Sequence, residues 1–152
     1  MENKSEIITE DVKKALQDAF RQLRDNVAIE VYTKEGVNDM FNDFTVDLIK
    51  TMSELTDKIK PTYYKIGDEQ SLKRNILRSP TVLVAPDKYS IRYTGAPAGE
   101  EGRSIVMAII MVSTGQTILT DDSKKRLQRL KEKREIKVFV SPTCPYCPQQ
   151  VL

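Results

Sequence analysis

The only two cysteines of the chain, Cys144 and Cys147, stand three positions apart near its carboxyl end. A Cys-x-x-Cys pair can exchange with disulfides, because one thiolate attacks a disulfide and the second thiol resolves the mixed disulfide. The same spacing supplies half of a zinc site, and such thiols can also be inert. The chain has no histidine, the commonest partner of cysteine at zinc, so a zinc site would need the cysteines of a second chain. We therefore favour dithiol redox chemistry.

The residues around the cysteines predict a strand, a turn and a helix. Val138-Phe139-Val140 is a short apolar run typical of a buried strand, and Pro148 with the residues after it indicates the start of a helix. At a helix N-terminus, unpaired backbone N–H groups and the helix dipole favour a thiolate over a thiol. We therefore expect a lowered thiol pKa at this turn.

The composition of the 152 residues excludes several classes of protein. With 39% apolar and 30% charged residues, the chain can build a core of one or two small domains. The net charge of +2, with both signs mixed, gives no case for nucleic-acid binding. The longest apolar run, 105–112, is too short to cross a membrane, and residues 1–20 carry no secretory signal pattern. Two cysteines in a single pair suit a reducing compartment, so we expect a cytoplasmic protein.

The hydrophobic periodicity and the turn residues predict an α/β fold. Helices are expected over 5–24, 38–58, 69–77, 100–113 and 120–133, and strands over 27–33, 62–66, 81–85 and 90–94. A strand–helix–strand start gives parallel pairing with a right-handed crossover, and a hairpin and a helix complete the unit. This order is the thioredoxin-like plan of a four-stranded mixed sheet flanked by helices.

Specific residues then carry a family resemblance. Residues 138–148, VFVSPTCPYCP, closely resemble the second active site of the protein disulfide oxidoreductases, which are glutaredoxin-like proteins with two thioredoxin-fold units in tandem. Residues 91–100 resemble the end of their first unit, where an aromatic residue, a glycine, a proline and a second glycine stand in this order. Residues 55–58 resemble the end of that unit's first long helix. The same arrangement is similar to the N-terminal domain of the flavoprotein subunit of alkyl hydroperoxide reductase, over residues 8–152.

The resemblance implies a role for each residue of the CPYC turn. Cys144 would be the nucleophile at the exposed edge before the helix, and Cys147 the resolving thiol one turn into it. Pro145 and Tyr146 would tune the thiol pKa and shape the approach of substrate. The partners would be disulfide-bearing proteins, or a peroxidase or thioredoxin-reductase partner. No metal or cofactor is expected in this chain.

Ser79-Pro80-Thr81 matches, by position, the loop that carries a cis-proline before the third strand in this fold. In such proteins the residue before the proline pairs with an extended substrate. An ordinary trans proline that starts a strand is the alternative. We expect a cis bond, with Pro80 either structural or a remnant of peptide docking.

The chain departs from the family pattern in two ways. The first unit holds Val37-Asn38-Asp39-Met40 where the disulfide oxidoreductases carry a Cys-x-x-Cys, so we expect it to be redox-inactive. The second unit has only its first strand and its active-site turn. We therefore divide the chain into a first unit (1–118), a helical linker (119–135) and the start of a second unit (136–152), and interpret it as a fragment of a longer protein.

The functional hypothesis is a thiol–disulfide oxidoreductase that acts in cell redox homeostasis and is weakly active or inactive as this fragment. One alternative is the N-terminal electron-transfer domain of a flavoprotein, with FAD and NAD(P)H in a missing C-terminal part, which the redox-inactive first unit favours. A second alternative is a non-catalytic scaffold over residues 1–118. A third is a zinc ion shared by two chains.

Overall fold

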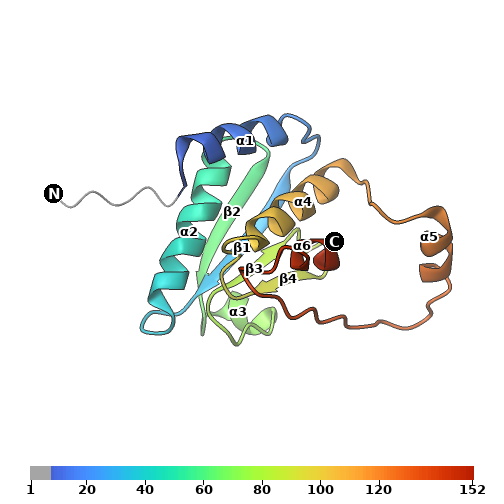
Figure 1. Cartoon of the computed structure of the whole chain (residues 1–152). Coiled ribbons are helices and arrows are strands. Elements are labelled where there is room, and N and C mark those ends of the chain that lie inside the picture. Colours follow the sequence, from blue (N-terminus) through green and yellow to red (C-terminus); the bar gives the residue numbers. More distant parts are fainter. Residues whose placement is uncertain (1–7) are drawn as a thin grey trace.

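A four-stranded mixed sheet lies at the centre of the computed structural model, which describes residues 8–152 (Figure 1). Its strands are β1 (Val27–Thr33), β2 (Ile59–Lys65), β3 (Thr81–Val84) and β4 (Ile91–Thr94), in the order β2-β1-β3-β4. β1 pairs in parallel with β2 and antiparallel with β3, which in turn pairs antiparallel with β4. The predicted mixed sheet and its strand–helix–strand start are confirmed.

Helices cover both faces of this sheet. They are α1 (Glu10–Phe20), α2 (Asp39–Glu54), α3 (Glu69–Lys73), α4 (Glu101–Thr114), α5 (Asp121–Leu127) and α6 (Cys147–Val151). α1, α2 and α4 share the main core on one face, and α3 lies on the other, whereas α5 stands away from the sheet (Figure 1). None of the helices in the described part of the chain is long and apolar enough to cross a bilayer.

The main core forms where the periodicities of strand and helix meet. Val27, Ile29 and Val31 alternate along β1 and point to one face, while Leu48 and Met52 lie one turn apart on α2. All five are buried in the same cluster. Burial of each such side chain contributes about 1.5–3 kcal/mol, so this face provides the rigid base for the loops at the ends of the strands.

The other face is held by a polar network around Glu30. The hydroxyl of Tyr32 donates to Glu30 Oε2 (2.6 Å), and Gln70 donates to Oε1 (3.1 Å). Arg74 pairs with Glu30 (3.2 Å) and with Asp87 (2.6 Å). Burial raises the pKa of Tyr32, and its hydrogen bond to Glu30 adds to the shift. The network ties α3 to the sheet and leaves the buried carboxylate paired.

Two predicted boundaries between α2 and β2 are wrong. The helix expected over 38–58 ends at Glu54, and β2 starts at Ile59 rather than at residue 62. Pro61, which was expected to stop the helix, instead lies inside β2 opposite Ile29. A proline is tolerated there because β2 is an outer strand of the sheet.

α3 is shorter than the predicted 69–77. It ends at Lys73, and Asn75 adopts a left-handed conformation with φ 53°. Ile76 is buried as expected, but Leu72 and Leu77 are 71% and 80% exposed, so their inward placement was wrong. The early end of the helix breaks the spacing on which that expectation depended.

Two further helices, α1 and α5, are also shorter than expected. α1 occupies Glu10–Phe20 of the predicted 5–24, with Thr9 as its N-cap as expected; residues 5–7 lie outside the described part. α5 occupies Asp121–Leu127 of the predicted 120–133 and buries none of its residues. A helix without a packed face retains only the turns that its cap supports.

The buried strand predicted at Val138-Phe139-Val140 does not form. Phe139 is 93% exposed, Val138 and Val140 are 44% and 40% exposed, and residues 136–140 have no regular structure. A strand needs a neighbour to complete its backbone hydrogen bonds. Within residues 8–152, no strand pairs with this segment.

Candidate dithiol site

The cysteine pair lies in a tight turn that leads into α6. Cys144 N–H donates to the carbonyl of Ser141 (3.0 Å), and Cys147 N–H donates to the carbonyl of Cys144 (3.3 Å). α6 begins at Cys147, so the second cysteine is the first helical residue rather than one turn inside the helix. Both thiols are free and half-buried.

The two thiols have pKa shifts of opposite sign. A hydrogen bond from Cys147 is the main effect that lowers the pKa of Cys144, and the backbone of Tyr146 adds to it. The same contact is the main effect that raises the pKa of Cys147. The lowered pKa expected for this turn therefore applies to Cys144 alone, and the geometry makes it the more acidic of the pair.

The dithiol turn lies against α4 and the loop before it. The carbonyl of Pro142 accepts a hydrogen bond from the N–H of Glu100 (3.0 Å), in the loop that leads into α4. Pro148, at the start of α6, is buried, and α6 lies against α4 (Figure 1). Residues more than forty positions apart in the sequence therefore form one site.

Glu101, the first residue of α4, is a site residue that sequence reasoning missed. It is only 4% exposed, and Ser104 Oγ donates to its Oε2 (3.0 Å). Its Oε1 is buried and finds no hydrogen-bond partner among the described residues. The negative charge of Glu101 raises the pKa of both Cys144 and Cys147. An acidic residue in the first turn of a helix is ordinary dipole compensation, so its sequence position carried no functional signal.

Tyr93 on β4 is a second buried polar group on this side of the first unit. Its hydroxyl also has no hydrogen-bond partner in the described chain. Burial raises the pKa of Tyr93, the nearby Ser104 hydroxyl lowers it in part, and the charge of Glu101 raises it. Tyr93 and Glu101 thus place two buried polar oxygens on the side of the sheet that α4 covers.

The Ser79–Pro80 bond is cis, as expected, and a network of hydrogen bonds joins Asn38 and Asn42 to Ser79. Asn38 is left-handed (φ 58°), and its Nδ2 donates to the carbonyl of Ser79 (2.8 Å). Ser79 Oγ donates to Asn42 Oδ1 (2.7 Å) and accepts from the N–H of Lys34 (2.7 Å). The carbonyl expected to pair with substrate already has an internal partner, which favours a structural role for Pro80.

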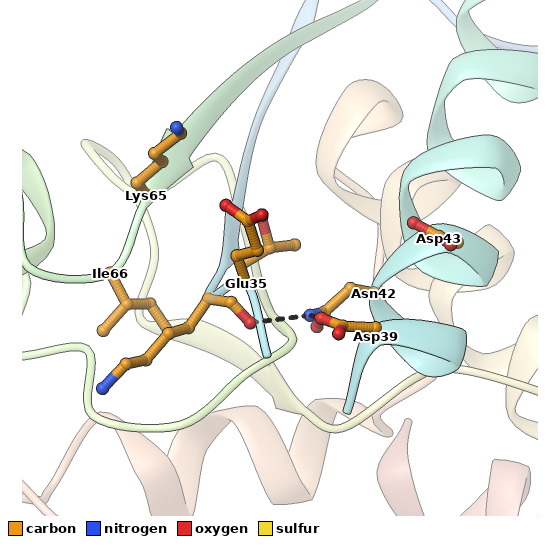
Figure 2. A pocket seen from close by; sticks show the side chains of 8 residues that line it. Glu35, Asp39, Asn42, Asp43, Lys65 and Ile66 are labelled. Atoms are coloured by element: carbon orange, nitrogen blue, oxygen red, sulfur yellow. Dashed lines mark hydrogen bonds between the residues drawn. The ribbon is translucent and has the colours of Figure 1, made fainter. Parts of the chain in front are cut away.

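A shallow pocket of about 330 Å³ lies beside this network, and Figure 2 shows the side chains around it. Its lining residues are mostly polar or charged: Thr33, Lys34, Glu35, Asp39, Asn42, Asp43, Lys65 and Ile66. Asn42 Nδ2 donates to the carbonyl of Lys34 (3.0 Å), and the carboxylate of Asp39 accepts from the N–H of Gly36 (2.9 Å). Two of the pocket's polar side chains, Asn42 and Asp39, therefore hold the loop in place. Nowhere in residues 8–152 are three or more histidine, cysteine or acidic side chains placed to hold a metal ion.

Comparison with solved structures shows which proteins share this fold. A protein disulfide oxidoreductase from Aeropyrum pernix superposes on 94% of the chain with a TM-score of 0.84 and 28% identity, and 64% of its own length is covered. The chain has the fold of a disulfide oxidoreductase. The predicted thioredoxin-like fold and the resemblance to these proteins are confirmed.

The disulfide oxidoreductase fold is shared with peroxide-reducing systems. The NTD_N/C domain of alkylhydroperoxide reductase AhpF from Enterococcus faecalis matches 94% of the chain with a TM-score of 0.80 and 25% identity, over 70% of that domain. The alkyl hydroperoxide reductase AhpF of Staphylococcus epidermidis is 28% identical over 145 residues. The match covers 95% of this chain and 26% of the relative, so the chain spans about a quarter of the curated relatives it matches. No protein-family model matches the chain.

Proposed function

We propose that the chain is the amino-terminal part of a cytoplasmic thiol–disulfide oxidoreductase in which Cys144 and Cys147 react and the first unit is redox-inactive. The observation that carries this proposal is the pair of half-buried thiols with opposite pKa shifts beside a buried carboxylate. Perturbed titratable groups gathered in one place are typical of functional sites. The fold of the first unit supports the same class of chemistry.

The reaction is a two-step thiol–disulfide exchange. The Cys144 thiolate attacks one sulfur of a substrate disulfide, forms a mixed disulfide and expels the other substrate sulfur as a thiolate. Cys147 then loses its proton and attacks Cys144 Sγ, which releases the second substrate thiolate. The substrate gains two electrons, and Cys144 and Cys147 are left joined by a disulfide. A dithiol or a reduced flavin must return those two electrons before the next cycle.

We propose that Glu101 takes the proton from Cys147. The pKa of Cys147 is raised, so its thiolate does not form readily without a base. Glu101 is a buried carboxylate with an unpartnered oxygen, and its charge acts on this thiol. Pro145 and Tyr146 are exposed between the cysteines, and Tyr146, at 75% exposure, offers a surface for a protein substrate.

A second candidate function is electron transfer within a flavoprotein that reduces a peroxidase. The observation that favours it is the replacement of the first dithiol by an amide network, together with the match to AhpF over 95% of the chain. In that case FAD and NAD(P)H belong to a part of the protein beyond this chain. The source of the electrons therefore separates the two candidate functions.

The test is thiol alkylation followed by enzyme assays of the intact protein. We expect iodoacetamide to modify Cys144 before Cys147 at neutral pH and Cys144→Ser to abolish reduction of a protein disulfide such as insulin. Cys147→Ser is the matched variant, and it should trap the mixed disulfide on Cys144. Equal alkylation of both thiols at the rate of free cysteine would overturn the proposal. Reduction of the pair by NADH through an attached flavin, and not by glutathione, would select the flavoprotein.

A further inference from the structure

Among the glycines, Gly99 makes the closest approach to the dithiol turn. A Cβ added at Gly99 would overlap the carbonyl oxygen of Pro142 and would lie 3.2 Å from its carbonyl carbon and 3.3 Å from its Cβ. The overlapping atom is backbone, so it cannot swing aside as the end of a flexible side chain can. Gly99 also has φ +59°, a conformation that favours glycine. Two independent requirements thus meet at this position.

The close approach at Gly99 makes a specific hydrogen bond possible. With no side chain in the way, the carbonyl of Pro142 reaches the N–H of the next residue, Glu100, at 3.0 Å. An N–H at the start of a helix has no partner inside that helix, so this bond satisfies an otherwise orphan donor. It also fixes the turn that begins two residues before Cys144.

The contact sets where the thiols lie relative to the first unit. Glu101 follows Glu100 directly, and its charge acts on both cysteines. Pro148 is buried where α6 meets α4, so the turn is held at both ends. A shift of Pro142 would therefore carry the cysteines away from the buried carboxylate.

We infer that Gly99 is a positioning residue for the dithiol, and that the redox-inactive first unit sets the reactivity of the cysteines through the bond from Glu100 N–H to the Pro142 carbonyl. The inference rests on the proposed function, because it concerns the same two thiols. It gives the first unit a part in the chemistry without any cysteine of its own. A glycine that served only to form the loop from Gly95 to Gly99 would not need to contact the dithiol turn.

Gly115 provides a matched control for Gly99. It ends the same helix, α4, with φ +67°, and a Cβ added there would meet nothing within 4 Å. Gly99→Ala and Gly115→Ala therefore introduce the same kind of backbone strain, but only the first reaches Pro142. We expect Gly99→Ala in the intact chain to move the midpoint of the Cys144 thiolate titration to lower pH, and so to raise the thiolate fraction at neutral pH, because the thiol moves away from the charge of Glu101. Gly115→Ala should leave the titration unchanged.

A measurement on the unaltered chain tests the same contact without any substitution. Amide hydrogen exchange of Glu100 should be slower by about tenfold or more than that of Met40, a first-turn amide of α2 for which no partner is found in the described chain. Glu100→Pro, which keeps φ near −61° and removes the N–H, should shift the thiolate titration as Gly99→Ala does.

The outcomes separate this inference from the proposed function. Rapid exchange at Glu100, or identical titrations for Gly99→Ala and Gly115→Ala, would overturn the positioning role even if the thiols are active. Thiols in the unaltered chain that titrate like free cysteine would instead remove the proposed function, whatever the exchange at Glu100.

Discussion

At the scale of single residues, Cys144 and Cys147 differ although they share one turn. Each is the other's hydrogen-bond partner, so the contact that stabilises the Cys144 thiolate also keeps the proton on Cys147. The ordinary cysteine pKa is about 8.5. Alkylation of Cys144 should therefore become half-maximal at a lower pH than alkylation of Cys147. Peptide mass spectrometry after alkylation across a pH series checks this, and superimposed profiles would contradict it.

The sign of the pH dependence of stability follows from Cys144. Because the folded state lowers the pKa of this thiol, it stabilises the thiolate above the unfolded pKa, and this contribution is lost as the pH falls through the folded pKa. Cys147 has the opposite sign, because its pKa is raised in the folded state. Stability therefore rises with pH from the folded pKa of Cys144 to the unfolded cysteine pKa, and falls from there to the folded pKa of Cys147. We expect the melting temperature to pass through a shallow maximum between the two thiol titrations.

Glu101 supports a second prediction at this scale. Glu101→Gln removes the charge and keeps the shape, so the pKa of both thiols should fall and the mixed disulfide on Cys144 should resolve more slowly. Absorbance of the thiolate in the far ultraviolet and rapid-quench trapping of the mixed disulfide measure the two effects. Glu100→Gln is the control, because its side-chain carboxylate is partly exposed beside Arg103 and is not among the charges that shift the thiol pKa values, and the substitution keeps the backbone N–H that bonds Pro142. The same result from both variants would count against a specific role for Glu101.

At the scale of elements, the hydrogen-bond network at the start of α2 stabilises the fold. Ser79 is 6% exposed and links Asn42 to the backbone of Lys34. Ser79→Ala leaves two polar partners without a bond and should lower the free energy of unfolding by about 1–3 kcal/mol. Ser53→Ala, on the exposed side of α2, removes a hydroxyl bonded to the carbonyl of Lys50 and should cost less than about 0.5 kcal/mol. Urea unfolding compares the two, and equal costs would show that the network is dispensable.

The order of the elements was predictable from the sequence, whereas several of their ends were not. The alternation of β1 and the four-residue spacing of α2 are strong local signals, and both elements form as expected. Pro61 was misassigned because its tolerance depends on β2 being an outer strand, which only the assembled sheet shows. Residues 138–140 do not form the predicted strand, because an apolar run forms a strand only where a neighbouring strand can pair with it.

Only part of the candidate site was predictable from the sequence. Cys144 and Cys147 follow from residue type and spacing, and the cis bond at Pro80 follows from the resemblance. Glu101 and Gly99 lie in the other half of the molecule, and their local roles as a first-turn acid and a loop glycine already explain them. The contact of Gly99 with Pro142 and the effect of the Glu101 charge on the thiols exist only after the chain folds back.

At the scale of the whole molecule, residues 136–140 present apolar side chains without a partner surface. Phe139→Ser should change the free energy of unfolding of this chain by less than about 0.5 kcal/mol, because Phe139 is 93% exposed. Ile29→Ala, in the buried core, should cost about 2–5 kcal/mol. Denaturant titrations measure both. A large cost for Phe139→Ser would show that this segment packs in solution.

A longer polypeptide that completes the predicted second unit should reverse the result for Phe139. The strand expected over 138–140 would then have neighbours, and Phe139→Ser would become destabilising. Insulin reduction should rise in parallel, because the dithiol turn would be supported on both sides. Vigorous turnover by the 152-residue chain alone would contradict this expectation.

The proline inside β2 has a consequence for how these molecules behave at high concentration. An outer strand offers a row of free backbone groups with which another molecule's strand can pair, and this is a route to aggregation. Pro61 carries no N–H, so the row on β2 is interrupted in its middle. Restoring a donor there with Pro61→Val should make the protein less soluble while leaving the fold and the thiols as they are.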